Sequence, residues 1–499
     1  MDTRCFFLLA SQNQHAGNSN ARVHLSSEQA HLIPRSDTMA QRKRSRASGN
    51  ASNEMEAPQP TVRGATGRFL MLVEDGGREA AKRLMRAGAG LELAVASDFA
   101  EADTIPDPGL GQAMYFDEIG VAVVNAPPDQ SRFLATRAAA AETPTLIEPE
   151  RYVHVLEAAL DYDTLTPYDV GTESPVVFGA SPDYARGWFD GVNDARLRTM
   201  PGGQIGELVQ PGTAAINERD FTWGLQAVGV PGNRFTGRGI RIAILDTGID
   251  LIHPEMGRRV AGSRSFVPNE TVQDVNGHGT HTAGTAAGPA GANLRPRYGV
   301  APNSELFVGK VLSNAGSGTD GWILAGIQWA IQNQCVIVSM SLGARTQVGE
   351  PFSQIYERVA QRAFTRGMLI VAASGNDSAR PTSIRPVARP ANCPSIMAVA
   401  AVGMGLEIAP FSNGGINPNG GAVDIAAPGI NVLSSSPGGS ERLNGTSMAT
   451  PHVAGVAAIF AESNASLRGR ALFDAITRGS RRLPLPPRDA GAGLVRCPR

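Results

Sequence analysis

The sequence has little of what marks several common classes of protein. No run of about 18 or more apolar residues occurs among its 499, so no transmembrane helix is predicted. Its 45 basic and 46 acidic residues give a net charge of −1, so charge offers no argument for a nucleic-acid or membrane partner. The four cysteines form no C-x-x-C pair, which suggests neither a zinc site nor a disulfide framework. They are Cys5, Cys335, Cys393 and Cys497, of which Cys335 and Cys393 adjoin apolar strands and are expected in the core.

The first residues do not show a clear targeting signal. The opening "MDTRCFFLLASQNQ" holds an apolar run of only six residues, which is shorter than a secretory signal needs. Met39 begins a second plausible start, "MAQRKRSR". The sequence therefore leaves the compartment open between secreted and cytoplasmic.

Length and composition divide the chain into four parts. A chain of 499 residues is too long for one ordinary core. Residues 1–65 are polar and poor in large apolar side chains, so we expect a disordered tail, in which the basic run 41–46 is solvated. Residues 157–220 form a connector without clear periodicity, apart from a possible helix at 183–198.

A small α+β domain is predicted over residues 66–156. Strand-like runs occur at 68–74, 91–97, 120–126 and 144–156. Helical patterns lie between them at 77–88 and 129–140; in the first, Ala81, Leu84, Met85 and Gly88 form one stripe. The order strand–helix–strand–strand–helix–strand is that of the split βαβ, or ferredoxin-like, arrangement.

Residues 221–499 alternate apolar strands with helices. The strand-like runs are almost continuously apolar, as in strands covered on both faces, and lie at 241–245, 305–312, 336–343, 368–375 and 396–403. Helical patterns lie at 321–333 and 351–367. The alternation predicts an α/β fold with a doubly wound, mostly parallel sheet, in which ligands bind beyond the carboxyl ends of the strands.

Four polar residues stand at the ends of these strands or open helices. Asp246 and Asn376 follow apolar strands, whereas His278 and Ser447 open helices of small residues. A lone serine in that position is normally a helix cap. Together, however, the four are the parts of acyl transfer: a hydroxyl nucleophile, an imidazole base, a carboxylate that orients the base, and an amide that stabilises the developing oxyanion.

The segments that carry these residues resemble the signature segments of the subtilisin-like serine peptidases. They are "AILDTGID", "NGHGTHTAGT", "SMSLG", "AASGN" and "NGTSMATPHVAG", and they occur in that family's order of Asp, His and Ser. The resemblance runs from about Trp223 to Val495. It implies a serine endopeptidase that acts on extended polypeptides, with Asp246, His278 and Ser447 as the triad and Asn376 in the oxyanion hole.

The resemblance also implies where a substrate lies. Two glycine-containing edges would hold it as an added β-strand, with Gly375 beside them; the edges are Gly316-Ser317-Gly318 and Ser341-Leu342-Gly343. Ala388, with its neighbours Arg385 and Arg389, is expected near the pocket for the residue before the scissile bond. Asp320 is expected to rim a pocket further out. Because opposite charges are expected at different pockets, the sequence predicts no single preference for a substrate side chain.

Other interpretations of these residues are less favoured. "DTG" is also the motif of aspartic proteases, but that chemistry needs two carboxylates and a second DTG is absent. His281 and His452 are expected to be structural because helical spacing turns them away from their catalytic neighbours. His253, before Pro254 in a turn, is expected to be solvated. His278 and His281 lack the glutamate of a zinc H-E-x-x-H motif, so no metal is assigned.

No cofactor is predicted to be required. Many members of the family carry a calcium loop after the histidine helix, but residues 288–298 here contain no carboxylate and two arginines. Calcium prefers several oxygen ligands, carboxylates among them. A structural calcium ion remains possible, although this loop does not support it.

The domain at 66–156 is similar in position and pattern to the propeptides of that family, which assist folding and then block the active site. We therefore expect an intramolecular inhibitor. About 65 residues separate Leu156 from Phe221, so either cleavage falls soon after 156 or the connector occupies the cleft. Two other functions stay open: a catalytically silent relative that acts as a binding or scaffold protein, and an independent interaction module attached to a peptidase.

Overall fold

The computed structural model describes residues 64–73, 77–99, 105–140, 146–156, 216–291 and 295–499. Most of the predicted tail, and the connector with its possible helix at 183–198, lie outside these residues. No helix in the described ranges is long and apolar enough to cross a membrane.

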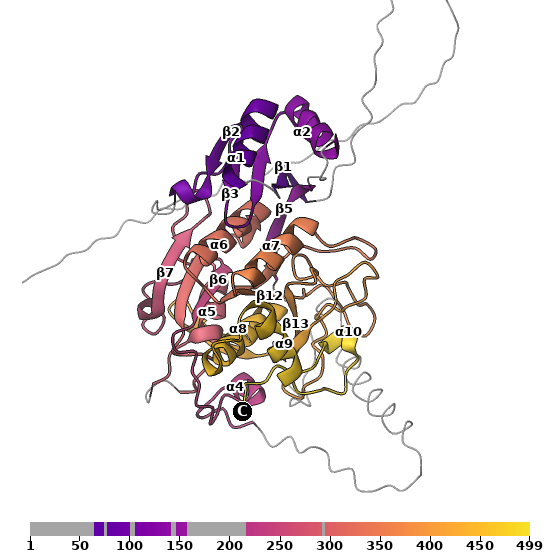
Figure 1. Cartoon of the computed structure of the whole chain (residues 1–499). Helices are drawn as coiled ribbons and strands as arrows, with labels where there is room; N and C mark the ends of the chain where they lie inside the picture. The colour runs from indigo at the N-terminus through magenta and orange to yellow at the C-terminus, as the bar shows by residue number, and fades with distance from the viewer. Residues whose placement is uncertain (1–63, 74–76, 100–104, 141–145, 157–215, 292–294) are drawn as a thin grey trace, which may run out of the picture. The chain divides into compact units, whose positions relative to one another are not determined.

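Seven parallel strands form the central sheet of the C-terminal part, which confirms the doubly wound α/β class (Figure 1). Their spatial order is β14 (Ile425–Pro428), β13 (Met397–Val402), β12 (Leu369–Ala373), β10 (Ile337–Met340), β6 (Arg241–Asp246), β8 (Glu305–Lys310) and β7 (Val260–Ser265). From β6 the chain adds strands first on one side and later on the other. The strand order thus reverses at β6 and β10, where such sheets bind their ligands.

Helices cover both faces of this sheet because successive strand residues point to opposite sides. Ile242 and Ile244 belong to the core shared with α5 (His278–Ala287) and α8 (Thr446–Ser463). Ala243 and Leu245 belong to the core shared with α6 (Asp320–Gln332) and α7 (Gln354–Thr365). The smaller elements are α4 (Trp223–Val228), η4 (Gly257–Arg259), β15 (Val432–Ser436), β16 (Gly439–Leu443), α9 (Gly469–Gly479) and α10 (Pro487–Ala490).

The N-terminal domain is a five-stranded sheet. Its elements are β1 (Ala65–Leu72), α1 (Gly77–Lys82), the π-helix η1 (Arg83–Gly88), β2 (Glu92–Val95), the 3-10 helix η2 (Ala96–Phe99), β3 (Gln112–Phe116), β4 (Val121–Asn125), α2 (Pro128–Ala140) and β5 (Ile147–Val155). The strand order is β5-β1-β4-β3-β2. β3 is absent from the four-strand order predicted above, because a five-residue strand buried on both faces shows no alternating pattern. β2 then becomes an added edge strand parallel to β3.

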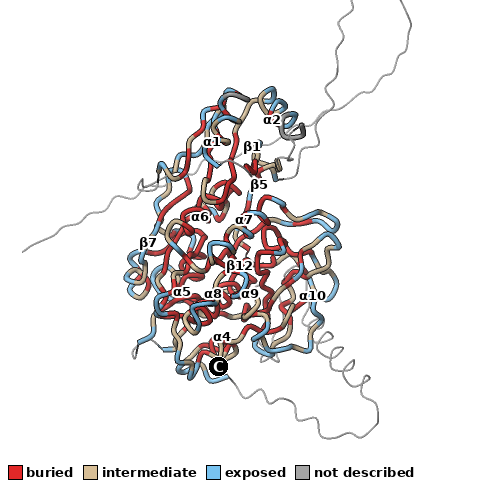
Figure 2. The backbone as a smooth tube through the Cα atoms, in the orientation of Figure 1, coloured by how far each residue is buried: buried red, intermediate tan, exposed pale blue. Residues whose placement is uncertain are grey.

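The two faces of this sheet pack against different parts of the chain. Met71, Ala122 and Val124 belong to a core within the domain, shared with residues of η1 and α2. Leu70 and Leu72 point the other way and belong to the core that includes α6 and α7. Both are fully buried. Figure 2 shows the same buried colour along β12 of the central sheet. One layer of this domain is therefore supplied by α6 and α7 of the C-terminal part.

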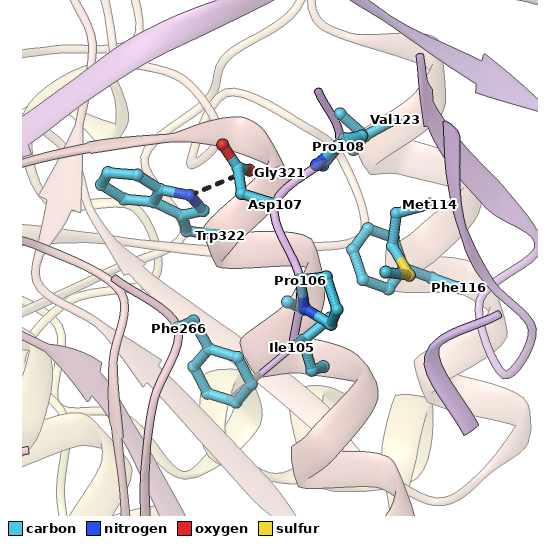
Figure 3. A pocket seen from close by; sticks show the side chains of 11 residues that line it. Ile105, Pro106, Asp107, Pro108, Met114, Phe116, Val123, Phe266, Gly321 and Trp322 are labelled. Carbon is cyan, nitrogen blue, oxygen red and sulfur yellow. Dashed lines mark hydrogen bonds between the residues drawn. The ribbon is translucent and has the colours of Figure 1, made fainter. Parts of the chain in front are cut away.

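The segment before β3 closes this interface at one edge. Asp107 accepts a hydrogen bond from the Trp322 indole at 3.3 Å and forms an ion pair with Arg68 at 2.7 Å (Figure 3). A cavity of about 20 Å³ remains beside them, lined mainly by apolar side chains such as Phe116 and Phe266. That volume holds about one water molecule, so the cavity is a packing defect of the interface and not a substrate site.

Candidate active site

Asp246 and His278, predicted as partners, are brought together at the end of β6. Asp246 is fully buried, and its Oδ1 lies 2.7 Å from Nδ1 of His278, the first residue of α5. The same oxygen accepts the backbone N–H of Thr247 at 2.8 Å. Its Oδ2 accepts the hydroxyl of Thr282, one helical turn beyond His278, at 3.2 Å. These bonds fix the carboxylate plane and direct one oxygen at the imidazole.

A second buried carboxylate, not singled out from the sequence, joins the segment after β6 to the start of α5. Asp274 Oδ1 accepts the hydroxyl of Thr247 at 2.9 Å and the backbone N–H of Gly277 at 2.9 Å. Its Oδ2 accepts the N–H and the hydroxyl of Thr280 at 2.8 and 2.7 Å. Thr247 Oγ1 in turn accepts the N–H of Gly279 at 2.8 Å. The sequence feature that could have identified Asp274 is its place four residues before His278, which opens α5.

Ser447 lies in the first turn of α8 but does not cap it. The N-cap residue is Gly445, and no side chain forms the capping bond. The Ser447 hydroxyl instead donates to the carbonyl of Leu156 at 2.8 Å. The Ser447 carbonyl would normally accept the N–H four residues on, but that residue is Pro451, which has none. It accepts the Ser341 hydroxyl at 2.7 Å, which ties α8 to one predicted substrate edge.

The amide of Asn376 is oriented by its oxygen. Oδ1 accepts both the backbone N–H and the hydroxyl of Thr446, at 2.9 and 2.8 Å. Because two donors face Oδ1, the NH₂ group is left to point the other way. There Nδ2 donates to the carbonyl of Leu156. The side chains of Ser447 and Asn376 therefore converge on one carbonyl oxygen.

The two predicted substrate edges enclose the end of β5. β9 (Ser317–Thr319) pairs antiparallel with residues 152–154, and Gly316 accepts the Val155 N–H at 2.9 Å. On the other side β11 (Leu342–Gly343) pairs antiparallel with residues 154–155. Residues 152–155, the end of β5, thus lie between both edges, and Leu156 follows them directly.

The side chain of Leu156 is buried beside Gly343 and Ala388. A Cβ built on Gly343 would lie 3.2 Å from Leu156 Cδ1 and 3.4 Å from the Ala388 Cβ. Gly375 also adjoins Ala388; its φ is +109°, and a Cβ there would stand 2.2 Å from the Asn413 amide nitrogen. Glycine is therefore required at 375, for backbone and space alike.

The charges expected at separate pockets instead form one buried pair. Arg389 Nη2 lies 3.3 Å from Asp320 Oδ2, and both side chains are buried. The Tyr356 hydroxyl donates to Asp320 at 3.1 Å. Burial raises the pKa of Asp320, and the adjacent Arg389 guanidinium opposes that rise. The charges of Asp320 and Arg389 thus compensate each other, which the identities of the side chains alone could not reveal. Arg385, the third residue expected near these pockets, is exposed.

Three other histidines are buried in structural positions. His281 Nε2 contacts the Val432 carbonyl at 3.0 Å, and burial, with the nearby His278, lowers its pKa to about 3. His452 Nδ1 contacts the Met448 carbonyl at 2.8 Å, and burial lowers its pKa to about 4. The expectation that His253 is solvated is wrong: it is buried, with Nε2 at 2.7 Å from the Gly439 carbonyl. The neighbouring hairpin β15–β16, which the sequence did not predict, covers it.

Metal ligands are not assembled in the described part of the chain. No group of three or more His, Cys, Asp or Glu side chains is placed there to hold an ion. Cys335, Cys393 and Cys497 are buried free thiols, and burial raises the pKa of each.

Comparison with known proteins identifies the family. The family model described as the subtilase family matches residues 237–493. Subtilisin from Bacillus pumilus is 41% identical over 254 residues, which cover 49% of this chain and 87% of that protein. Subtilisin Savinase from Lederbergia lenta is 42% identical over 283 residues, covering 55% and 96%. Subtilisin E from Bacillus subtilis is 41% identical over 244 residues, covering 47% of this chain and 60% of that protein. The chain therefore belongs to the subtilase family, and it is a serine-type endopeptidase.

Proposed function

We propose that Asp246, His278 and Ser447 are the catalytic triad, and that the chain is made as an autoinhibited precursor whose N-terminal domain fills its own active site. The observation that carries this proposal is the double hydrogen bond to the Leu156 carbonyl, from the Ser447 hydroxyl and the Asn376 amide. A scissile carbonyl group must lie against both the nucleophile and an oxyanion donor. The Leu156 carbonyl, which follows an inserted strand, contacts both side chains.

In the proposed reaction His278 removes the proton of Ser447 as Oγ bonds to the carbonyl carbon. Asp246, whose Oδ1 lies 2.7 Å from Nδ1, orients the imidazole so that Nε2 can act as the base, and it stabilises the imidazolium. The oxyanion is held by Nδ2 of Asn376 and by the Ser447 N–H, which has no partner within its helix because it lies in the first turn. His278 then protonates the amine as the C–N bond breaks. Water hydrolyses the acyl-enzyme by the same steps in reverse order.

The inhibitory role of the N-terminal domain is supported by two carboxylates on β5. Glu150 is fully buried, and its Oε1 accepts the N–H of Gly321 at the start of α6 at 3.0 Å. Glu148 accepts the N–H of Ile355 at 3.2 Å and the hydroxyl of Ser353 at 2.5 Å, at the start of α7. Helix N-termini carry unpaired N–H groups and partial positive charge, so both contacts favour docking. A module with no role toward this peptidase would not need them.

The proposed processed bond joins Leu156 to Glu157 and does not lie within the later connector, because the Leu156 carbonyl accepts the bonds from Ser447 and Asn376. The test compares the intact mass and new N-terminus of the purified wild-type protein with those of Ser447→Ala. Wild type should yield a product that begins at Glu157, and the variant should remain uncut. An uncut wild type, a cut variant, or a cut far from residue 156 would contradict the proposal.

A further inference from the structure

The sixth residue before the proposed cleavage point touches two acidic side chains of the peptidase. Arg151 lies just beyond residues 152–154, which pair with β9. Its backbone N–H continues the ladder by donating to Asp320 Oδ2 at 2.9 Å. Its guanidinium Nη1 bonds to Glu350 Oε1 at 2.6 Å. Arg151 and Glu350 side chains keep only 21% and 24% of their surface exposed.

Both acids are held in place by residues of the peptidase. Asp320, the first residue of α6, is fixed by the Tyr356 hydroxyl and by Arg389. Glu350 directs its other oxygen to the Gln347 N–H at 3.0 Å, and its carbonyl accepts the Asn417 amide at 2.7 Å. The site is thus organised without Arg151. Since Arg389 compensates Asp320, Glu350 supplies the uncompensated charge.

We propose that Asp320 and Glu350 form a substrate subsite for a cationic side chain six residues before the scissile bond. This inference rests on the proposed function, because it counts from Leu156. Asp320 would bind the main chain of any residue there, whereas Glu350 would select arginine or lysine. A partly exposed ion pair gives modest discrimination, so the expected preference is about 3-fold in kcat/KM at low salt and less at high salt.

The test uses two internally quenched peptides that copy residues 147–160 and differ only in carrying Arg or Gln at position 151. The full-chain protein is assayed as wild type, Glu350→Gln and Glu305→Gln; Glu305 is a control acid 44% exposed, paired with Arg241. Wild type and the control should prefer the Arg peptide about 3-fold, and Glu350→Gln should lower the ratio to about 1. The ratio within each preparation is independent of the amount of active enzyme.

Equal rates on both peptides in wild type, or a preference that survives in Glu350→Gln, would overturn the subsite. If one of these outcomes is found while cleavage after the leucine is still lost in Ser447→Ala, the proposed function stands and only the subsite fails. Absence of any Ser447-dependent cleavage overturns both. A preference that appears only in binding of the N-terminal domain, and not in peptide hydrolysis, assigns Arg151 to the domain interface and also overturns the subsite.

Discussion

The two folded parts of this chain differ in where their defining contacts come from. In the peptidase part, the side chains at the site are oriented by neighbours in the same part: Asp246 by Thr282, and Asn376 by Thr446. In the N-terminal domain, one face of the sheet is buried largely against α6 and α7 of the peptidase, as the core that contains Leu70 and Leu72 shows. The first part therefore carries a preorganised site, whereas the second lacks a complete core of its own.

This difference bears on the proposed inhibition of the peptidase by the N-terminal domain. A domain that completes its core on α6 and α7 is held there by apolar burial as well as by the inserted strand. Changes in the peptidase site should then alter chemistry with little effect on docking. Changes in the interface should alter docking with little effect on chemistry. The four predictions below test this separation, from the largest expected effect to the smallest.

Ser447→Ala should abolish peptide hydrolysis and leave thermal stability nearly unchanged. Ser447 does not cap α8, so alanine removes no helix-capping bond. The alternative interpretation of this serine as a cap predicts the opposite: retained activity and a loss of about 1 kcal/mol. Hydrolysis of a fluorogenic peptide and thermal unfolding of the same preparations distinguish the two. Full activity in the variant would remove Ser447 from the triad.

Asn376→Asp should lower kcat by about 10²–10³ or more, with little change in KM, because it removes a donor needed only in the transition state. That range is the one measured for removing such a donor in a subtilisin. Aspartate keeps an oxygen for the two bonds from Thr446, so the local fold should persist. Thr446→Val, which removes only the hydroxyl that orients Asn376, is the matched control and should cost less. An effect confined to KM would make Asn376 a ground-state binding residue.

Asp274→Asn should lower kcat by about 10–100-fold by loosening the geometry of Asp246 and His278. An amide cannot accept on both sides, so its NH₂ would face either the N–H and hydroxyl of Thr280 or the Thr247 hydroxyl and the Gly277 N–H. The low-field proton resonance of His278 Nδ1–H should shift, which a general loss of stability would not cause. Asp250→Asn is the control, since the Asp250 carboxylate is also buried and bonds only to Ile252 and Gln273. Equal losses in both variants would argue against a positioning role for Asp274.

The sequence predicted those features that depend on residue type and on position along the chain. The parallel strands were predictable because they are almost wholly apolar. The proposed site residues Asp246, His278, Asn376 and Ser447 could be singled out because each stands at a strand end or a helix start. Asp274 and Lys310 were missed because their importance lies in long-range contacts. Lys310, for example, is fully buried and donates to the Thr247 carbonyl at 2.6 Å, a contact that no local pattern encodes.

The lack of information on long-range contacts in local sequence also explains the other differences between the predictions and the structure. β3 is too short to show a period, and His253 is buried by a hairpin that lies 186 residues further along the chain at Gly439. The compensation between Arg389 and Asp320 depends on a distance of 3.3 Å. Chemistry that follows from a motif could be predicted, whereas burial and charge pairing depend on the assembled fold.

Glu150→Gln should weaken inhibition by the N-terminal domain about 10-fold or more while leaving peptide chemistry unchanged. Glu150 is fully buried and accepts bonds from Arg68 Nε and Nη2 at 2.6 and 2.8 Å, from Thr66 and from Gly321. Glutamine offers one acceptor oxygen in place of two and leaves the largely buried Arg68 guanidinium with Asp107 as its remaining partner, which costs more than the loss of one hydrogen bond.

The measurement is activity per mole of processed protein as it is diluted, because dilution releases a cleaved but bound domain. In Glu150→Gln the midpoint of release should move to a concentration about 10-fold or more higher. The fully diluted activity should equal that of wild type, since Glu150 touches none of the residues at the reacting carbonyl. Glu79→Gln changes an exposed acid of the same domain, paired only with Lys82 at 2.9 Å, and should leave the midpoint unchanged. If activity per mole does not depend on concentration in wild type, the domain is not an inhibitor. If both variants behave alike, docking does not depend on the contact between Glu150 and α6. The N-terminal domain would then not rely on this contact with the peptidase, which contradicts the contrast drawn between the two parts.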